Sequence, residues 1–131
     1  MSSRVKTHNP PDVHAPFSTY SHGVEAPPGA RWLHVSGQVG VDGDGTTPEA
    51  FDAQAGLAFR NLSAVLSSAG MGPEDLVKVT VFLTRAADIP ALRVARSTFQ
   101  GNAAPASTLV VVQSLARPEW LIEVEAIAAR L

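Results

Sequence analysis

The sequence contains no cysteine, few aromatic residues (6%) and few charged residues (17%). Without cysteine the chain has no disulfide bond, no thiolate nucleophile and no cysteine-ligated zinc. Ten basic residues against twelve acidic ones give a formal net charge of −2. This balance excludes the strongly basic character by which proteins bind the phosphate backbone of nucleic acids. We therefore expect no nucleic-acid partner.

Long apolar runs are also missing. The longest aliphatic run covers residues 109–112, which is far too short to cross a bilayer. The polar segment 1–19 lacks the apolar stretch of a secretory signal, and we interpret it as an extended or mobile arm. At 131 residues the chain is long enough to bury a core as one domain, residues 1–131. We expect a cytoplasmic protein with no membrane partner.

Two kinds of hydrophobic periodicity divide the chain into helices and strands. Thr47 and Pro48 predict a capped helix start, and Gly70 predicts the end of that helix. Asp88 predicts the cap of a second helix that runs to about Phe99. Alternation of apolar and polar residues predicts strands at residues 32–42, 76–84, 105–112 and 121–128.

This order of elements predicts an α+β fold in which two helices cover one face of a sheet. Gly37 interrupts the first predicted strand, where we expect a β-bulge or the close approach of another group. On this strand Leu33, Val35 and Val39 are expected to share one face. The uncovered face of the sheet mixes polar and apolar residues, which favours its burial by partner subunits.

Most polar clusters have a simpler interpretation than a metal or cofactor site. Asp42 and Asp44 lie in a glycine-rich turn without the ligand offsets of a calcium loop. The four histidines lack ligand spacing, and the glycines match neither a dinucleotide fingerprint nor a P-loop. Arg93 and Arg96 lie on the second predicted helix without neighbouring aromatic residues, which favours a solvated face. We expect no metal and no cofactor.

Glu123 and Glu125 are the acidic pair with the strongest functional pattern. Two residues apart on a strand, they lie on the same face at a separation of about 7 Å. Both alternate with large aliphatic residues. They are either solvent-facing acids of an edge strand or, in a partly desolvated cleft, groups that handle the proton of a water or substrate.

Five ordered motifs resemble the RidA (YjgF) family of reactive intermediate deaminases. They are Tyr-Ser-His-Gly-Val at 20–24, Val-Ser-Gly-Gln-Val at 35–39, Val-Lys-Val-Thr-Val-Phe-Leu at 77–83, Pro-Ala-Ser-Thr at 105–108 and Ile-Glu-Val-Glu-Ala-Ile-Ala at 122–128. The resemblance implies a chorismate-mutase-like mixed sheet with two helices on one face. It also implies a homotrimer with small-molecule clefts between subunits.

The resemblance further implies roles for individual residues. Glu123 would orient a water against an imine carbon, while Tyr20, Ser36 and Gly37 would shape the cleft. Leu109 takes a position whose backbone faces the ligand in the family.

One position departs from the family. The deaminating members carry an arginine directly after the Pro-Ala pair, where its planar fork binds the substrate carboxylate, and Ser107 stands there in this chain. We therefore expect an altered substrate preference. Arg93, where the deaminases carry an asparagine, is a hypothetical replacement cation.

The resemblance thus implies a small-molecule-binding homotrimer that hydrolyses an enamine or imine to a carbonyl compound and ammonia. The alternative is a non-catalytic metabolite-binding or chaperone-like homotrimer. Activity on imines that depends on Glu123 would separate the two.

Overall fold

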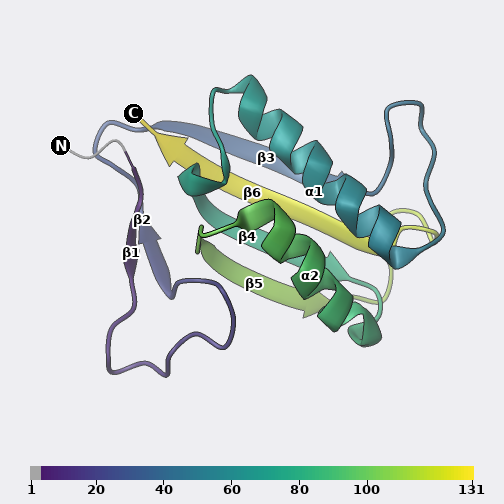
Figure 1. Cartoon of the computed structure of the whole chain (residues 1–131), viewed down its shortest axis with the longest axis horizontal. Coiled ribbons are helices and arrows are strands. Elements are labelled where there is room, and N and C mark those ends of the chain that lie inside the picture. Colours follow the sequence, from purple (N-terminus) through teal and green to yellow (C-terminus); the bar gives the residue numbers. More distant parts are fainter. Residues whose placement is uncertain (1–3) are drawn as a thin grey trace.

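The computed structural model describes residues 4–131 and shows an α+β fold with two helices on one face of a mixed sheet (Figure 1). The predicted fold class is therefore confirmed. The elements are β1 (Lys6–His8), β2 (Gly23–Glu25), β3 (Arg31–Val39), α1 (Phe51–Ser68), β4 (Leu76–Leu83), α2 (Ile89–Gln100), β5 (Ala106–Val111) and β6 (Ile122–Arg130), with short 3-10 turns at Pro73–Asp75 and Ala86–Asp88.

The main sheet has four strands in the order β3-β6-β4-β5. Strands β4 and β5 are parallel and are joined through α2, whereas β6 is antiparallel to both of its neighbours, β3 and β4. This order leaves β3 and β5 as the two edges of the sheet in a single chain. Their backbone groups are therefore available for pairing with another copy.

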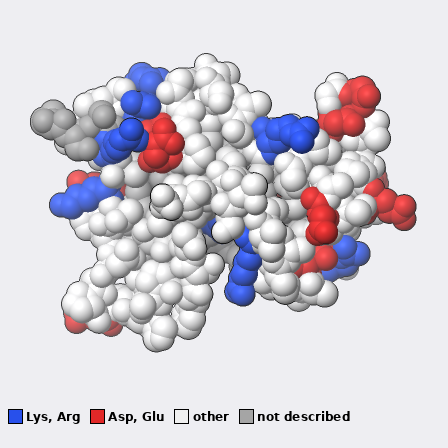
Figure 2. Space-filling view, viewed as in Figure 1, with Lys and Arg blue, Asp and Glu red and all other residues white. Residues whose placement is uncertain are grey.

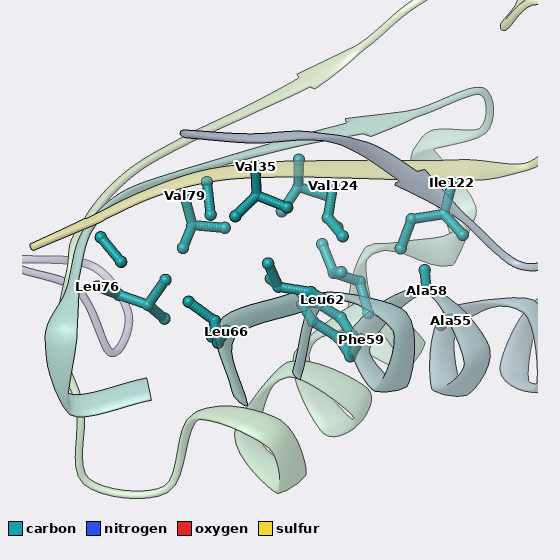
Figure 3. Packing of buried hydrophobic residues seen from close by; sticks show 14 of the residues in the cluster. Val35, Ala55, Ala58, Phe59, Leu62, Leu66, Leu76, Val79, Ile122 and Val124 are labelled. Atoms are coloured by element: carbon teal, nitrogen blue, oxygen red, sulfur yellow. The ribbon is translucent and has the colours of Figure 1, made fainter. Parts of the chain in front are cut away.

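The core lies between α1 and the sheet (Figure 3). Leu62 and Leu66 of α1 are fully buried and face Val79 and Val124 of the central strands. Phe59 extends the contact to the second helix, where its ring stacks on Phe99 at a centroid distance of 5.2 Å. Burial of these side chains holds both helices on one face, and only the other face of the sheet stays open.

The start of α1 differs from the prediction. The helix begins at Phe51, and its N-cap Ala50 makes no side-chain cap, so Thr47 does not cap it. The carbonyl of Pro48 instead accepts a hydrogen bond from the side chain of Gln54. Residues 46–50 are therefore held as a loop across the helix start.

The second helix begins after Asp88, as predicted, but its cap differs. The carboxylate of Asp88 makes no cap to the backbone of α2 and accepts a hydrogen bond from Arg85 Nε at 2.8 Å. The salt bridge thus takes the place of the predicted cap.

Strand β3 contains the expected irregularity at Gly37. The register with β6 shifts between Val35 and Gln38, which places a β-bulge at this point. After the bulge, Val39 pairs with Glu123 and so lies on the open face of the sheet. The expectation that Val39 shares a face with Val35 was wrong, because one extra residue reverses the alternation.

The N-terminal segment forms a small second sheet of its own. Strand β1 pairs antiparallel with β2, in register Thr7 with Val24. Residues 1–3 of the predicted arm lie outside the described residues. Within residues 4–131, no helix has the length and apolar character needed to cross a membrane.

Candidate functional site

One group of predicted site residues gathers at the start of β5. Ser21 forms an isolated parallel bridge with Ala106, and its backbone N–H donates to the carbonyl of Pro105 at 3.0 Å. The Ser21 hydroxyl donates to the carbonyl of Ala104. These bonds fix Tyr20 beside the β5 edge, and Ser107 follows directly on that strand.

Ser107 is bound by an arginine from helix α2. Arg96 Nη1 donates to the Ser107 hydroxyl oxygen at 2.8 Å, and Arg96 Nε donates to Gln100 Oε1 at 2.9 Å. The Gln100 amide in turn donates to the carbonyls of Thr19 and Ala103. Because Thr19 precedes Tyr20, one hydrogen-bond network joins the N-terminal segment, α2 and β5. We name Tyr20, Arg96, Gln100 and Ser107 the β5 half-site.

Arg96 does not lie on a solvated face, contrary to the sequence-based interpretation. Its side chain is half-buried, and burial lowers the pKa of its guanidinium below the usual value. The Nη2 atom is shielded from solvent and has no hydrogen-bond partner. The sequence offered one signal for this role, because Arg96 and Gln100 are spaced one helical turn apart and therefore share a face of α2.

A second group gathers on the open face of the sheet near β3. Glu123 of β6 pairs with Val39 of β3 and with Phe82 of β4. Its side chain lies against Gly37, where an added β-carbon would be 2.7 Å from Glu123 Oε1. Gly37 thus provides the space that the carboxylate occupies, as the expected close approach required. We name Ser36, Gly37 and Glu123 the β3 half-site.

The two half-sites do not meet within one chain. Ser107 pairs with the buried Val79 and so faces the helices, whereas Glu123 alternates with the buried Val124 and faces away from them. The edges β3 and β5 are three strand spacings apart, about 14 Å. A site that uses both half-sites therefore requires two copies of the chain.

The remaining predicted residues have clear positions. Arg93 is exposed on α2, one turn before Arg96, and makes no hydrogen bond or ion pair among residues 4–131. Leu109 is half-buried, pairs with Val81 and packs against the core. Glu125 is exposed on the open face, beside Thr80 of β4.

One groove of the single chain lies away from both half-sites. A groove of about 870 Å³ runs between α1 and α2 and is lined by residues such as Phe59, Arg60 and Val94. None of the predicted site residues lines it. Among the described residues, no group of three or more histidine, aspartate or glutamate side chains is placed to hold a metal ion.

Charges on the helical face are scattered. Figure 2 shows acidic and basic side chains in small groups with wide uncharged areas between the groups, without a continuous basic stripe on this face.

Solved structures define the class of fold. A conserved Rid family protein from Yersinia pestis superimposes with a TM-score of 0.84 at 31% identity, covering 98% of this chain and 99% of that one. The YjgF gene product of Escherichia coli superimposes with a TM-score of 0.71 at 31% identity, covering 96% and 99%. The chain thus has the α+β fold of the Rid proteins.

Sequence comparison agrees with the fold. The model of the family Endoribonuclease L-PSP matches residues 11–130. A 2-iminobutanoate/2-iminopropanoate deaminase from Salmonella typhimurium is 34% identical over 134 residues, 99% of each chain. A RutC family protein from Pyrococcus horikoshii is 30% identical over 131 residues, 98% of each chain. The protein belongs to the RidA family, also described as the YjgF, RutC or L-PSP family.

Proposed function

We propose that this protein hydrolyses an imine or enamine to a carbonyl compound and ammonia. The observation that carries the proposal is the position of Glu123. Its half-buried carboxylate lies over Gly37 and forms no hydrogen bond or ion pair with residues 4–131. Such a carboxylate is available to accept a proton from a water molecule. The similarity to a 2-iminobutanoate/2-iminopropanoate deaminase supports the same reaction class.

The chemistry needs one water and one proton acceptor. Glu123 takes a proton from the water while the oxygen attacks the imine carbon, and the C=N bond becomes a single bond to nitrogen. The nitrogen receives first the proton held by Glu123 and then the proton of the new hydroxyl group, so that the C–N bond breaks and ammonia leaves. A new C=O bond remains, and the carboxylate of Glu123 is regenerated. No metal or redox cofactor enters this balance.

The active assembly in this proposal is a homotrimer with clefts between subunits. The β3 half-site of one copy and the β5 half-site of the next would form each cleft. The open sheet face supports this arrangement, because Trp32 is 55% exposed and Val110 is 38% exposed in the single chain. Closed rings of identical subunits join two different surface patches in this way.

Within each cleft, the residues of the two half-sites would have different roles in ligand binding. Tyr20 and Ser36 would shape the walls, and the backbone of Leu109 would contact the ligand. Ser107 would act as the specificity position, because its hydroxyl carries no charge where the resemblance implies an arginine.

Imines generated in place by an amino-acid oxidase provide the test. We expect the protein to accelerate formation of the keto acid and ammonia, and Glu123→Gln to lower the rate by about 100-fold or more. Glu125→Gln is the matched control, since Glu125 lies two residues away on the same face but is exposed. No acceleration by the wild-type protein across a panel of imines would instead support the non-catalytic alternative.

A further inference from the structure

The groove between α1 and α2 is a mostly apolar surface on the helical face of the sheet (Figure 1). The stacked rings of Phe59 and Phe99 line it, and Val94 of α2 is 70% exposed beside them. A continuous apolar surface of this kind is typical of a place that another molecule covers. A contact between copies through the open face of the sheet would leave this groove uncovered, because the two faces are opposite.

Gly56 lies inside α1 and lines the same groove. Glycine in a helix interior lowers helix stability relative to alanine. A β-carbon added at Gly56 would have no neighbour within 4 Å beyond the adjacent backbone of α1, so packing among residues 4–131 does not require a glycine here. The missing side chain does leave room for the close approach of another backbone.

Asp52 and Arg60 carry opposite charges at equal distances from Gly56. Each is four residues away from it, so the three residues form one row on α1, and the two charged residues are about 12 Å apart along the helix axis. Both side chains are exposed and line the groove. Neither forms a hydrogen bond or an ion pair with any of residues 4–131.

We propose that this groove is a docking surface for a second copy of the chain, related to the first by a two-fold axis at Gly56. In this contact the two α1 helices cross in antiparallel directions, and Asp52 of each copy lies opposite Arg60 of the other. A two-fold contact requires a self-complementary patch, and an acid and a base at equal distances from a central glycine form one. Rows of residues spaced four apart are also the ridges by which helices most often pack together.

The pattern favours a second copy over other occupants of the groove. An unrelated helix or a small apolar molecule would need neither the symmetric charges nor the glycine between them. The second copy would also cover Val94 at the α2 side of the groove. The inference is independent of the proposed function, because none of these residues belongs to either half-site.

Exchange of the two charges tests the contact by analytical ultracentrifugation of the full-length protein. We expect the mass of the wild-type assembly to rise with protein concentration, and added salt to weaken this association. Asp52→Arg or Arg60→Asp turns both attractive pairs into repulsive ones and is expected to raise the dissociation constant at least about tenfold. The double variant Asp52→Arg, Arg60→Asp restores opposite charges and is expected to return to within about threefold of the wild type.

A matched control separates this effect from a change of net charge. Asp12→Arg alters the net charge as Asp52→Arg does, at an exposed residue outside the groove, and is expected to associate like the wild type. All four substituted proteins are expected to fold with a thermal midpoint close to that of the wild type, because Asp12, Asp52 and Arg60 are exposed.

The absence of cysteine from the sequence allows a direct test of the axis. Gly56→Cys places one thiol of each copy at the proposed axis, where oxidation by molecular oxygen with copper phenanthroline is expected to join two copies through a disulfide bond. Ala64→Cys is the matched control, since Ala64 is also exposed on α1. Its two copies would be about 24 Å apart in the proposed contact, which is too far for a disulfide bond.

Four results would overturn the inference. The first is a wild-type mass that does not change with concentration up to about 1 mM. The second is unchanged association of the folded single variants, and the third is a folded double variant that does not recover. The fourth is a Gly56→Cys protein that forms no more linked pairs on non-reducing gels than Ala64→Cys. A groove that binds an apolar dye in a protein of constant mass would indicate a different occupant and also contradict the proposal.

Discussion

Glu123 and Gly37 face each other across the β3–β6 pair so closely that position 37 has no room for a side chain. A β-carbon there would lie 2.6 Å from Cδ of Glu123, a distance that real β-carbons do not reach. The atoms it would meet belong to the flexible end of the Glu123 side chain and not to the backbone. The expected effect of a methyl group is therefore displacement of the carboxylate and not unfolding.

We accordingly expect Gly37→Ala to fold with a thermal midpoint close to that of the wild type and to lose at least about tenfold in imine hydrolysis. The physical reason is the move of the Glu123 carboxylate away from the position it needs for proton transfer. Rate and thermal midpoint are measured on the same preparation. Full activity of the folded variant would contradict the proposed role of Glu123.

Gly40→Ala is expected to lower the stability of the fold, in contrast to Gly37→Ala, which is expected to lower activity alone. A β-carbon at Gly40 would lie 2.5 Å from Cα and 2.6 Å from the carbonyl oxygen of Gln54, both backbone atoms of α1. The helix must move to make room, and we expect the free energy of unfolding to fall by about 3 kcal/mol. Chemical denaturation measures the change. A decrease of less than about 1 kcal/mol in the free energy of unfolding would show that α1 can move away from position 40 at little cost.

Gln54 holds two loops against the start of α1. Its side chain is buried, donates to the carbonyls of Pro48 and Glu119, and accepts from the backbone N–H of Leu121. Gln54→Ala leaves these three backbone groups without their partner, and we expect a loss of about 3 kcal/mol in the free energy of unfolding.

Replacement of Gln54 by glutamate is the informative comparison. The carboxylate would face two carbonyl oxygens that now accept hydrogen bonds, so Gln54→Glu is expected to destabilise the fold at neutral pH at least as much as Gln54→Ala. Equal stability of Gln54→Glu and the wild type in urea denaturation would show that these hydrogen bonds contribute little.

Mixing of two inactive variants tests whether neighbouring copies share each site. A Glu123→Gln subunit keeps its β5 half-site, and an Arg96→Met subunit keeps its β3 half-site. After joint refolding in equal amounts, random assembly of a ring unites the two intact halves in about one quarter of the clefts. We expect imine hydrolysis to recover to about that fraction of the wild-type rate. No recovery after mixing would show that both residues reach each site from the same copy of the chain, which contradicts a shared site.

The helices and the central strands could be predicted from the sequence, because residues buried on one face of an element recur at regular intervals. In β4 the buried residues Val79, Val81 and Leu83 alternate as predicted. This periodicity does not show which residues pair between neighbouring strands. Gly37 marked the irregularity of β3, but the face of Val39 depended on how the strand resumed after the bulge.

Some residues of the candidate site could also be predicted from the sequence, and one could not. Glu123 was visible as an acid within an apolar strand, and Tyr20 and Ser107 were visible through the family motifs. Arg96 was not, since its partners lie on other elements and its orientation depends on Gln100. Two arginines three residues apart on a helix look equivalent in a sequence, and only packing separates the half-buried one from the exposed one.

The cation of the β5 half-site is carried by a helix, while the strand beside it carries only a small hydroxyl. Ser107 is thus linked to the helix that covers the sheet as well as to its own strand. A substitution that removes its hydroxyl would leave the half-buried guanidinium of Arg96 with Gln100 as its one remaining acceptor among the described residues. Divergence at position 107 is therefore coupled to the seating of α2 against the sheet.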